Sequence, residues 1–178
     1  MSAALGPLEL VDGRCVVGDV RRSGGSWVEF REEGLYRHVP AAAEGELIPW
    51  HRVMLGLRVI IGRGYPSRGG NYSLRGLLGG LPGFKGRGVG HLDMTLRRPY
   101  EDWSVEFGRH RRSYRFTEVL LLDELLKQTV AAGEAHRLAD AVWLGAVVAR
   151  LKPLTAWSNG GIRNAVAEAR RAGEPTGA

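Results

Sequence analysis

Cysteine is almost absent from this sequence, which contains a single one, Cys15. One cysteine excludes an intrachain disulfide, whereas a secreted domain of this size commonly carries an even set. Because Cys15 lies within the apolar run Arg14–Val17, we expect it to be a small buried hydrophobic side chain rather than a reactive thiol. The cysteine count therefore favours a reducing compartment.

Long hydrophobic runs are missing as well. Stretches such as 119–122 are far shorter than the ~18 apolar residues that a membrane span requires. Residues 1–10 lack the basic and then apolar regions of a signal peptide, so we expect a cytoplasmic protein without a transmembrane segment. Apolar residues nonetheless make up 44% of the 178 residues, which is enough for the core of one domain and argues against a disordered chain.

Acidic residues are missing between positions 47 and 92, where seven basic residues occur. The whole chain has a net charge of +6, so its positive charge is concentrated in this stretch. Arginine outnumbers lysine 22 to 3, a bias that indicates a GC-rich genome such as that of an actinobacterium. Genome composition explains the choice of arginine over lysine but not the lack of acids.

Short alternating segments predict antiparallel strands in the first two thirds of the chain. Asp12-Gly13 separates two apolar runs, and this dipeptide favours the type I′ turn of a hairpin because both of its residues tolerate a positive φ. A second hairpin is predicted around the turn at 32–34. The strand candidates are 8–11, 14–17, 27–31, 35–39, 48–61, 92–96 and 103–107.

Helical spacing of apolar residues begins after these strands. Thr117 is the expected N-cap of a first helix, because threonine accepts hydrogen bonds from the first helical turn. A second helix is predicted over 134–151, and a third over 162–171, with Ser158 or Asn159 as its cap. The residues expected on one face of the second helix are Leu138, Val142, Ala146 and Ala149.

A run of strands followed by helices predicts an α+β fold. We expect about seven mostly antiparallel strands followed by two to three C-terminal helices. Residues 8–131 then form a β-rich domain closed by a helix, with a glycine-rich insertion at 62–90. Residues 134–172 form a C-terminal helical appendage, and residues 173–178 are expected to be disordered.

The order of these elements, seven meandering strands closed by a helix, resembles the pleckstrin-homology (PH) superfold. The sequence Glu46-Leu47-Ile48-Pro49-Trp50-His51-Arg52-Val53 is similar to the I-P-W-x-x-I step at which bacterial PH-like domains enter a strand. The resemblance covers residues 8–131, and it implies a PH-like meander or barrel with a binding role rather than a reaction. The insertion at 62–90 and the helices after Gly133 depart from that pattern.

Residues 62–90 contain 11 glycines, and a loop of this length in a compact domain is more often functional than inert. Glycines permit close approach of backbone N–H groups, which together with guanidinium groups can hold an anion. The alternative is a solvated loop whose arginines reflect genome composition. The candidate ligand-binding residues are Arg58, Arg63, Tyr65, Arg68, Tyr72, Arg75, Lys85 and Arg87.

Two further groups of residues are candidates for partner contacts. The first consists of arginines that flank the strand around Trp103 and can extend the basic patch, namely Arg97, Arg98, Arg109, Arg111, Arg112 and Arg115. The second consists of apolar residues that can form a groove or an anchor for a protein partner on the helices, namely Leu121, Leu125, Trp143, Val147 and Trp157.

No catalytic or metal-binding pattern is complete in the sequence. His91 and Asp93 lie two apart on a predicted strand, so they face the same way and the carboxylate can orient the imidazole, but no nucleophile accompanies them. Glu101 is the other candidate acid or base. The five histidines lack metal-ligand spacing, and the glycines at 79–90 satisfy neither a dinucleotide nor a P-loop motif. We therefore assign no catalytic residue, no metal and no cofactor.

Three functional hypotheses follow, in order of preference. The first is a non-enzymatic binding or adaptor domain that recognises an anionic partner through the basic glycine-rich loop; the partner is an acidic protein, a phosphorylated ligand or a lipid surface. The second is a nucleic-acid-binding regulator in which Tyr65, Tyr72 or Phe84 stacks on bases. The third is an enzyme of unknown class that uses the candidate acids and bases above.

Overall fold

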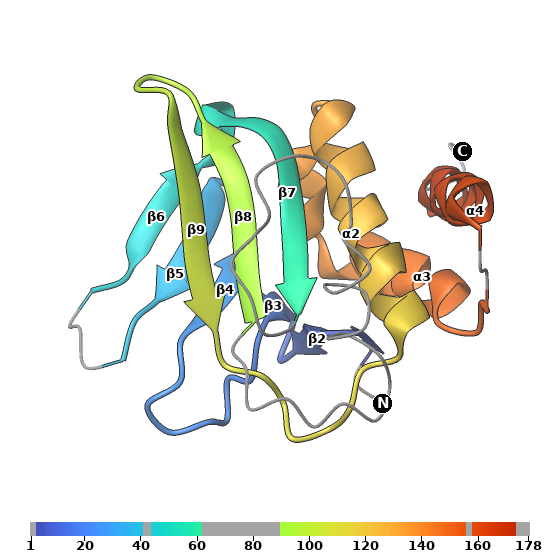
Figure 1. Ribbon diagram of the computed structural model, residues 1–178, viewed down its shortest axis with the longest axis horizontal. Helices are drawn as coiled ribbons and strands as arrows, with labels where there is room; N and C mark the ends of the chain where they lie inside the picture. Colours follow the sequence, from blue (N-terminus) through green and yellow to red (C-terminus); the bar gives the residue numbers. More distant parts are fainter. Residues whose placement is uncertain (1–2, 41–43, 62–89, 156–157, 174–178) are drawn as a thin grey trace.

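A computed structural model of the chain describes residues 3–40, 44–61, 90–155 and 158–173. These residues form two antiparallel sheets followed by three α-helices, so the expected α+β class with C-terminal helices is confirmed. In Figure 1 one sheet lies in front of the other, and the helices stand together along one side. The described chain is therefore a pair of packed sheets flanked by helices.

The first sheet contains six strands, arranged in the order in which they occur in the sequence. Every neighbouring pair is antiparallel, which makes the sheet a meander. Both predicted hairpins are confirmed, and in the first one Asp12 (φ 51°) and Gly13 (φ 76°) have the positive φ that a type I′ turn requires. The strands are β1 (Ala4–Leu5), β2 (Leu8–Val11), β3 (Arg14–Val17), β4 (Trp27–Phe30), β5 (Gly34–His38) and β6 (Glu46–Pro49).

The chain passes from the first sheet to the second through the short 3₁₀ helix η1 (Trp50–Arg52). The sequence predicts one strand over 48–61, but the structure divides this segment into β6 and β7 (Val53–Ile61). Pro49, with φ −62° and no N–H to donate, ends β6, and the indole Nε1 of Trp50 donates to the Arg31 carbonyl at 2.9 Å. Together with β1, this division gives nine strands in the described residues, where about seven are expected.

The second sheet consists of β7, β8 (Gly90–Leu96) and β9 (Glu101–Phe107), with β8 in the centre. Alternate residues of β8 are buried, which is the period-two pattern of a strand with one face on the core. Gly90 pairs with both Ile61 and Phe107 at one end of the sheet, and Leu96 pairs with Glu101 at the other end. A side chain at position 90 would collide with the Phe107 ring, so the register requires glycine there.

Helix α2 (Phe116–Ala131) begins before the expected N-cap Thr117. The Glu118 carboxylate accepts hydrogen bonds from the backbone N and the side-chain Nε of Arg115, at 3.3 and 3.0 Å, and Arg115 occupies the N-cap position. Arginine is not among the residues that N-cap preferences favour, which is why the boundary is misplaced in the sequence-based prediction. The helix is fixed to the edge of the second sheet by Asp123, whose Oδ1 accepts from the Val59 N–H at 3.0 Å.

The single helix predicted over 134–151 is two elements, the 3₁₀ helix η2 (Ala135–Ala139) and helix α3 (Ala141–Leu151). Asp140 divides them because its carboxylate accepts from the backbone N–H groups of Val142 and Trp143, at 2.9 and 3.0 Å, and thereby caps α3. This start changes which face of α3 is buried. Val142 is 84% exposed, so the expected face through 142, 146 and 149 is wrong. The buried residues of α3 are Trp143, Leu144, Val147, Val148 and Leu151.

Helix α4 (Asn159–Ala172) follows, and Ser158 caps it as expected, by accepting from the Gly161 N–H at 3.0 Å. One face of α4 is buried, with Val166 fully inaccessible. Val166 belongs to the same hydrophobic cluster as Phe107 of the second sheet and Leu35 of the first. The described part of the helical region therefore shares one core with the two sheets.

Several residues that the sequence offers for partner contacts lie inside this core. Leu121, Leu125, Trp143 and Val147 are each at most 3% exposed, so the expectation that they form an exposed groove is wrong. Trp157 lies outside the described residues. Cys15 is fully buried, as expected, and burial raises the pKa of its thiol to about 12.

Candidate functional site

The residues expected to bind an anion are mostly outside the described chain. Arg63, Tyr65, Arg68, Tyr72, Arg75, Lys85 and Arg87 all lie between the described ranges that end at Ile61 and begin at Gly90. Arg58 is described, on β7. Its Nε is 4.0 Å from Asp123 Oδ1, and the same buried carboxylate binds Lys127 Nζ at 2.6 Å.

In the acid-free stretch 47–92, the described arginines lie next to acidic residues from other parts of the chain. Asp123 of α2 is next to Arg58, and Glu101 of β9 binds Arg52 with an Nη2 to Oε1 distance of 2.7 Å. The described basic residues of this stretch are therefore balanced by carboxylates that are distant in sequence. A local count of charge does not show this balance.

Two loops at one end of the molecule form the largest described group of arginines, and we call this group the arginine-rich end. It consists of residues 18–26 between β3 and β4 and residues 108–115 between β9 and α2. The loops hold six arginines and one acidic residue, Asp19. Two hydrogen bonds join the loops, Asp19 N to Gly108 O (2.8 Å) and Gly108 N to Ser26 O (2.7 Å), and Ser26 Oγ donates to the Glu106 carbonyl of β9 at 2.6 Å.

A buried carboxylate on β2, that of Glu9, lies beneath these loops and is 8% exposed. Its Oε2 is 3.2 Å from Arg21 Nη1 and 3.3 Å from His110 Nε2, and its Oε1 is 3.5 Å from Arg112 Nη2. Arg112 also donates to the Gly6 carbonyl at 2.8 Å. Glu9 thus connects both arginine loops to the first sheet.

His110 and Tyr114 fix the shape of the second loop. The Tyr114 hydroxyl accepts from the His110 backbone N–H at 2.9 Å and lies 2.7 Å from His110 Nδ1. The Glu9 carboxylate, 3.3 Å from Nε2, favours the ring proton of His110 on that nitrogen, and Nδ1 then accepts from the Tyr114 hydroxyl. Burial lowers the pKa of His110, against the opposing attraction of Glu9, and burial also raises the pKa of Tyr114. Both groups are therefore neutral near pH 7.

Some arginines of this end point outward. Arg22 and Arg111 are exposed, and within the described residues neither one has an ion-pair partner. Arg115 differs, because its Nε binds Glu118 at 3.0 Å and its Nη2 donates to the Lys152 carbonyl at 2.5 Å. The guanidinium groups of Arg22 and Arg111 are thus the clearest described donors for an external anion.

Arg97 and Arg98, which the sequence suggests as part of the same patch, lie at the opposite end of the second sheet. They follow Leu96, whose partner on β9 is Glu101, whereas loop 108–115 follows Phe107, whose partner is Gly90. Six residue steps along β8 separate the two ends, which is about 20 Å. The expectation of one continuous patch is therefore wrong, because Arg97 and Arg98 lie at one end of the β8–β9 hairpin and the arginines of loop 108–115 follow its other end.

The candidate acid and base residues do not converge. His91 and Asp93 share a face of β8, as expected, and Asp93 Oδ1 accepts from Ser104 Oγ at 2.6 Å. Glu101 pairs with Leu96 at the far end of the hairpin, about 16 Å from His91 along the strand, and its carboxylate binds Arg52. None of the three lines the cavity that the structure describes.

A second buried glutamate, Glu29, lies on the same face of the first sheet as Glu9. Its Oε2 accepts from His38 Nε2 at 2.9 Å and from Arg31 Nη2 at 3.0 Å, and the His38 ring stacks on Trp27 at a centroid distance of 3.4 Å. Although burial opposes its ionisation, the hydrogen bonds from His38 and Arg31 lower the pKa of Glu29. A general acid needs the opposite shift, so this site is suited to holding the sheet surface together rather than to proton transfer.

Glu9, Glu29, His38 and His110 are not predicted from the sequence as residues of a site. Their positions on predicted strands and loops are visible in the sequence, but the contacts join residues up to 101 positions apart, as between Glu9 and His110. Within the described ranges, no three metal-ligating side chains lie close enough to hold an ion, and no helix is long and apolar enough to cross a membrane. The chain matches no protein-family model, no curated protein and no solved structure.

Proposed function

We propose that this chain is a non-enzymatic binding domain for an anionic macromolecule, which it contacts through the arginine-rich end. The observation that supports this most directly is the concentration of six arginines and one acid in two loops joined by backbone hydrogen bonds. Guanidinium groups bind carboxylates and phosphates through two parallel hydrogen bonds. Because the loops are already held in place, little ordering entropy opposes binding.

The segment between Ile61 and Gly90 is part of the proposal. Both residues pair at the end of the second sheet from which loop 108–115 departs, so the segment leaves and rejoins the fold there. In the proposal, its basic residues add to the anion-binding surface that the described loops begin. A PH-like relationship remains a proposal of the same kind, supported by the meandering strands and the I-P-W step. A cytoplasmic location is included, supported by the single cysteine.

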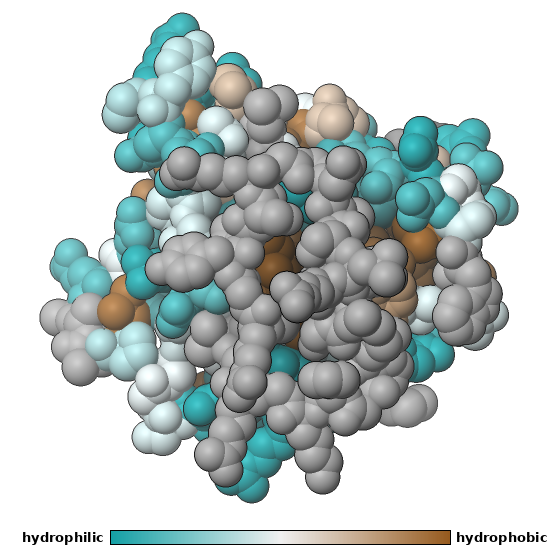
Figure 2. Space-filling view, viewed as in Figure 1, coloured by the Kyte–Doolittle hydropathy of each residue, from teal (hydrophilic) through white to brown (hydrophobic). Residues whose placement is uncertain are grey.

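The partner is proposed to be polar. Among the described residues, the large hydrophobic side chains that are exposed are Leu47 of β6, Tyr100 of the turn between β8 and β9, and Val142 of α3, so they lie on separate parts of the chain. In Figure 2 the described residues around the rim are mostly hydrophilic, and hydrophobic ones show in small areas nearer the middle. A charged contact therefore fits the described surface better than an apolar one.

A nucleic-acid-binding regulator is the second candidate, since duplexes and single strands are also polyanions. Base stacking would need an exposed aromatic side chain near the arginines. Tyr114, the aromatic residue within the two loops, is 4% exposed and cannot stack on a base. The two described loops therefore offer no aromatic face to a base, and the stacking candidates Tyr65, Tyr72 and Phe84 lie outside the described residues. We keep an acidic protein, a phosphorylated ligand or a lipid surface as the first proposal. Among the described residues, the candidate acids and bases of the enzyme hypothesis do not converge, because Glu101 lies at the far end of the hairpin from His91.

The test compares two double variants with equal charge change at opposite ends of the molecule. R22E/R111E alters the arginine-rich end, and R97E/R98E is the matched control. Binding is measured by co-sedimentation with vesicles containing phosphatidylserine, and by fluorescence anisotropy with an acidic peptide, a phosphopeptide and duplex and single-stranded oligonucleotides. R22E/R111E should weaken binding to the preferred anion about tenfold or more, because each lost charged hydrogen bond contributes about 1.5–3 kcal/mol.

The outcome of this comparison is decisive in each case. Equal losses in the two double variants indicate a general charge effect and reject the arginine-rich end as the site. Binding of oligonucleotides alone, with a steep dependence on salt, selects the regulator hypothesis. No binding to any of these anions at low salt rejects the proposed function altogether.

A further inference from the structure

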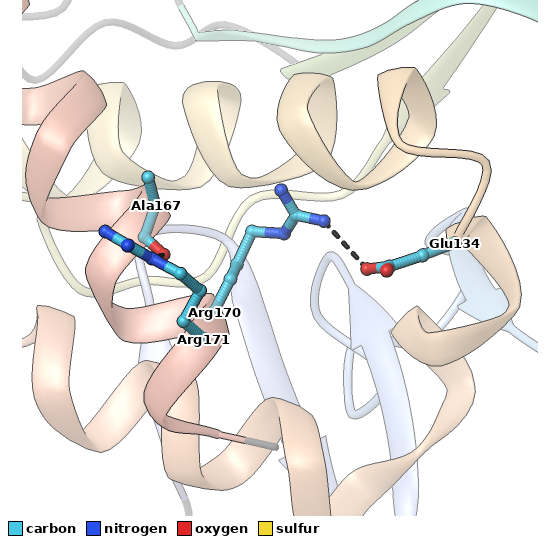
Figure 3. Close-up of a pocket in the computed structure, with 4 residues that line it drawn as sticks. All are labelled: Glu134, Ala167, Arg170 and Arg171. Carbon is cyan, nitrogen blue, oxygen red and sulfur yellow. Dashed lines mark hydrogen bonds and ion pairs between the residues drawn. The ribbon is translucent and has the colours of Figure 1, made fainter.

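A cavity of about 230 Å³ lies on the helical side of the molecule, between α4 and Glu134, the residue that precedes η2. Glu134, Ala167, Arg170 and Arg171 line it, as Figure 3 shows. Helix α2 has 16 residues and is about 24 Å long, with Arg115 of the arginine-rich end at its start and Glu134 just beyond its end. The cavity is therefore a separate site from the one proposed above.

The charges around this cavity are unequal. Glu134 Oε2 binds Arg170 Nη2 at 2.8 Å and is 3.5 Å from Arg137 Nη1, so one carboxylate is shared between two guanidinium groups. Arg171, on the wall of the cavity, donates from Nε to the Ala167 carbonyl at 3.2 Å and has no ion-pair partner in the described part of the chain. Two arginines and one acid thus line the cavity, and the acid also binds Arg137, so the described lining has an excess of positive charge.

Arg170 supplies an unsatisfied donor at the same place. Its Nε is buried and has no acceptor among the described residues, although its Nη2 is bound to Glu134. A buried charged donor without an acceptor is costly, so the positive charge of Arg170 beside the cavity is only partly compensated by Glu134. Figure 3 shows the Arg170 and Arg171 side chains leaving α4 in different directions, Arg170 toward Glu134 and Arg171 toward the side on which Ala167 lies.

We propose that this cavity binds a small oxyanion, the carboxylate or phosphate group of a small ligand, through the guanidinium groups of Arg170 and Arg171. Two guanidinium groups can each donate to different oxygens of one anion. The volume is below the ~300 Å³ at which sites for larger organic ligands begin, so the occupant is a single small anion or the charged end of a longer molecule. Glu134 orients Arg170, and Ala167 provides the apolar wall.

The experiment titrates the full chain with inorganic phosphate and, separately, with succinate, in chloride buffer of constant ionic strength. Binding is followed by calorimetry and by ¹⁵N chemical shifts of the Ala167 and Arg171 amides. We expect saturable binding of at least one of the two anions, with shifts at both amides. R171Q should weaken it about tenfold or more, the effect of losing one charged hydrogen bond. Because Arg171 is exposed and forms no ion pair within the described residues, this variant should fold, which circular dichroism verifies.

R163Q is the matched control, since Arg163 is an exposed arginine on the same helix that does not line the cavity. It should bind both anions as the wild type does. The proposal is overturned if neither anion binds up to about 10 mM, well above a Kd of 1 mM, or if R171Q and R163Q weaken binding equally. The arginine-rich end is tested independently, because R22E/R111E leaves this cavity intact and R171Q leaves the two loops intact.

Discussion

Glu9 illustrates how a single side chain can organise a positively charged surface. Its carboxylate contacts Arg21, His110 and Arg112, which come from two loops that are distant in sequence. Simple electrostatics would treat this negative charge as a hindrance to anion binding. The position of Glu9 indicates that its carboxylate assists anion binding, because without it Arg21 and Arg112 lose the partner that holds their guanidinium groups in place.

Replacing Glu9 should therefore weaken anion binding even though it removes a negative charge. E9A is expected to reduce affinity for the preferred anion severalfold and to destabilise the fold by about 1.5–3 kcal/mol, the usual contribution of a hydrogen bond to a charged group, since Arg21 and Arg112 remain accessible to water. E9Q keeps the shape and should have a smaller effect on both. Anisotropy titrations and urea denaturation measure the two quantities.

E32A is the control for this prediction, since Glu32 is exposed in the turn between β4 and β5 and forms no ion pair within the described residues. It removes the same charge without removing an organising contact. Tighter anion binding by E9A than by the wild type would contradict the organising role of Glu9.

His110 links this site to pH. Its pKa in the folded state is lowered by burial, with Arg112 acting in the same direction and Glu9 and Asp19 opposing. The unfolded chain therefore binds more protons than the folded chain below about pH 6.5. The stabilising contribution is complete above that pH and is lost as pH falls through the folded-state pKa of His110.

We expect the free energy of unfolding to decrease from pH 7 to pH 5, and to decrease less steeply in H110Q. The number of protons taken up on unfolding near pH 6 should fall by up to one in that variant. Urea denaturation over a pH series measures this, with H136Q at an exposed position as the control. An H110Q protein with the wild-type pH dependence would show that His110 titrates alike in both states.

At the scale of single residues, the sequence identifies side chains better than it identifies their partners. The burial of Cys15 and the shared face of His91 and Asp93 follow from local pattern, and the structure confirms both. The ion pairs of Arg52 and Arg58 with Glu101 and Asp123 depend on tertiary contacts. No local property of residues 47–61 indicates them.

At the scale of elements, local turn and cap chemistry decides which predictions succeed. Asp12-Gly13 is recognised as a hairpin because its preferred φ values are those of the turn. The break at Asp140 is not predicted, because apolar residues continue at helical spacing across it. Spacing alone does not indicate that the Asp140 carboxylate accepts hydrogen bonds from the first backbone N–H groups of α3. The division of 48–61 at Pro49 is missed for the same reason, since alternation resumes after η1.

The cap at Asp140 gives an element-scale prediction. D140A removes the acceptor for the Val142 and Trp143 N–H groups, and it should destabilise the protein by about 0.5–2 kcal/mol. D140N, which retains an acceptor oxygen, should cost less. Thermal or urea denaturation checks the order wild type, D140N, D140A. A D140A protein as stable as the wild type would mean that the packing of Trp143 alone defines the start of α3.

At the scale of the whole molecule, the class of fold follows from the order of strand and helix patterns, but the distribution of charge does not. The arginines after β8 and those after β9 are about twelve positions apart in the chain yet leave the sheet at opposite ends. Conversely, loops 18–26 and 108–115 are remote in sequence and bonded in space. Only the pairing of strands determines which arginines form one surface.

The pairing of Ile61 with Gly90 also brings together the two points of the second sheet that residues 62–89 connect. Two partnered residues of an antiparallel hairpin can be joined by Asn-Gly in place of the natural 28-residue connection, since that dipeptide forms the tightest hairpin turn. The shortened protein should fold and be more stable by about 2 kcal/mol, from the smaller entropy of loop closure. Urea denaturation of the shortened protein measures the stability of the fold without residues 62–89. Anion titration measures the binding that remains without them. The same pairing would allow evolution to insert, delete or replace residues 62–89 while the strands of the second sheet keep their register.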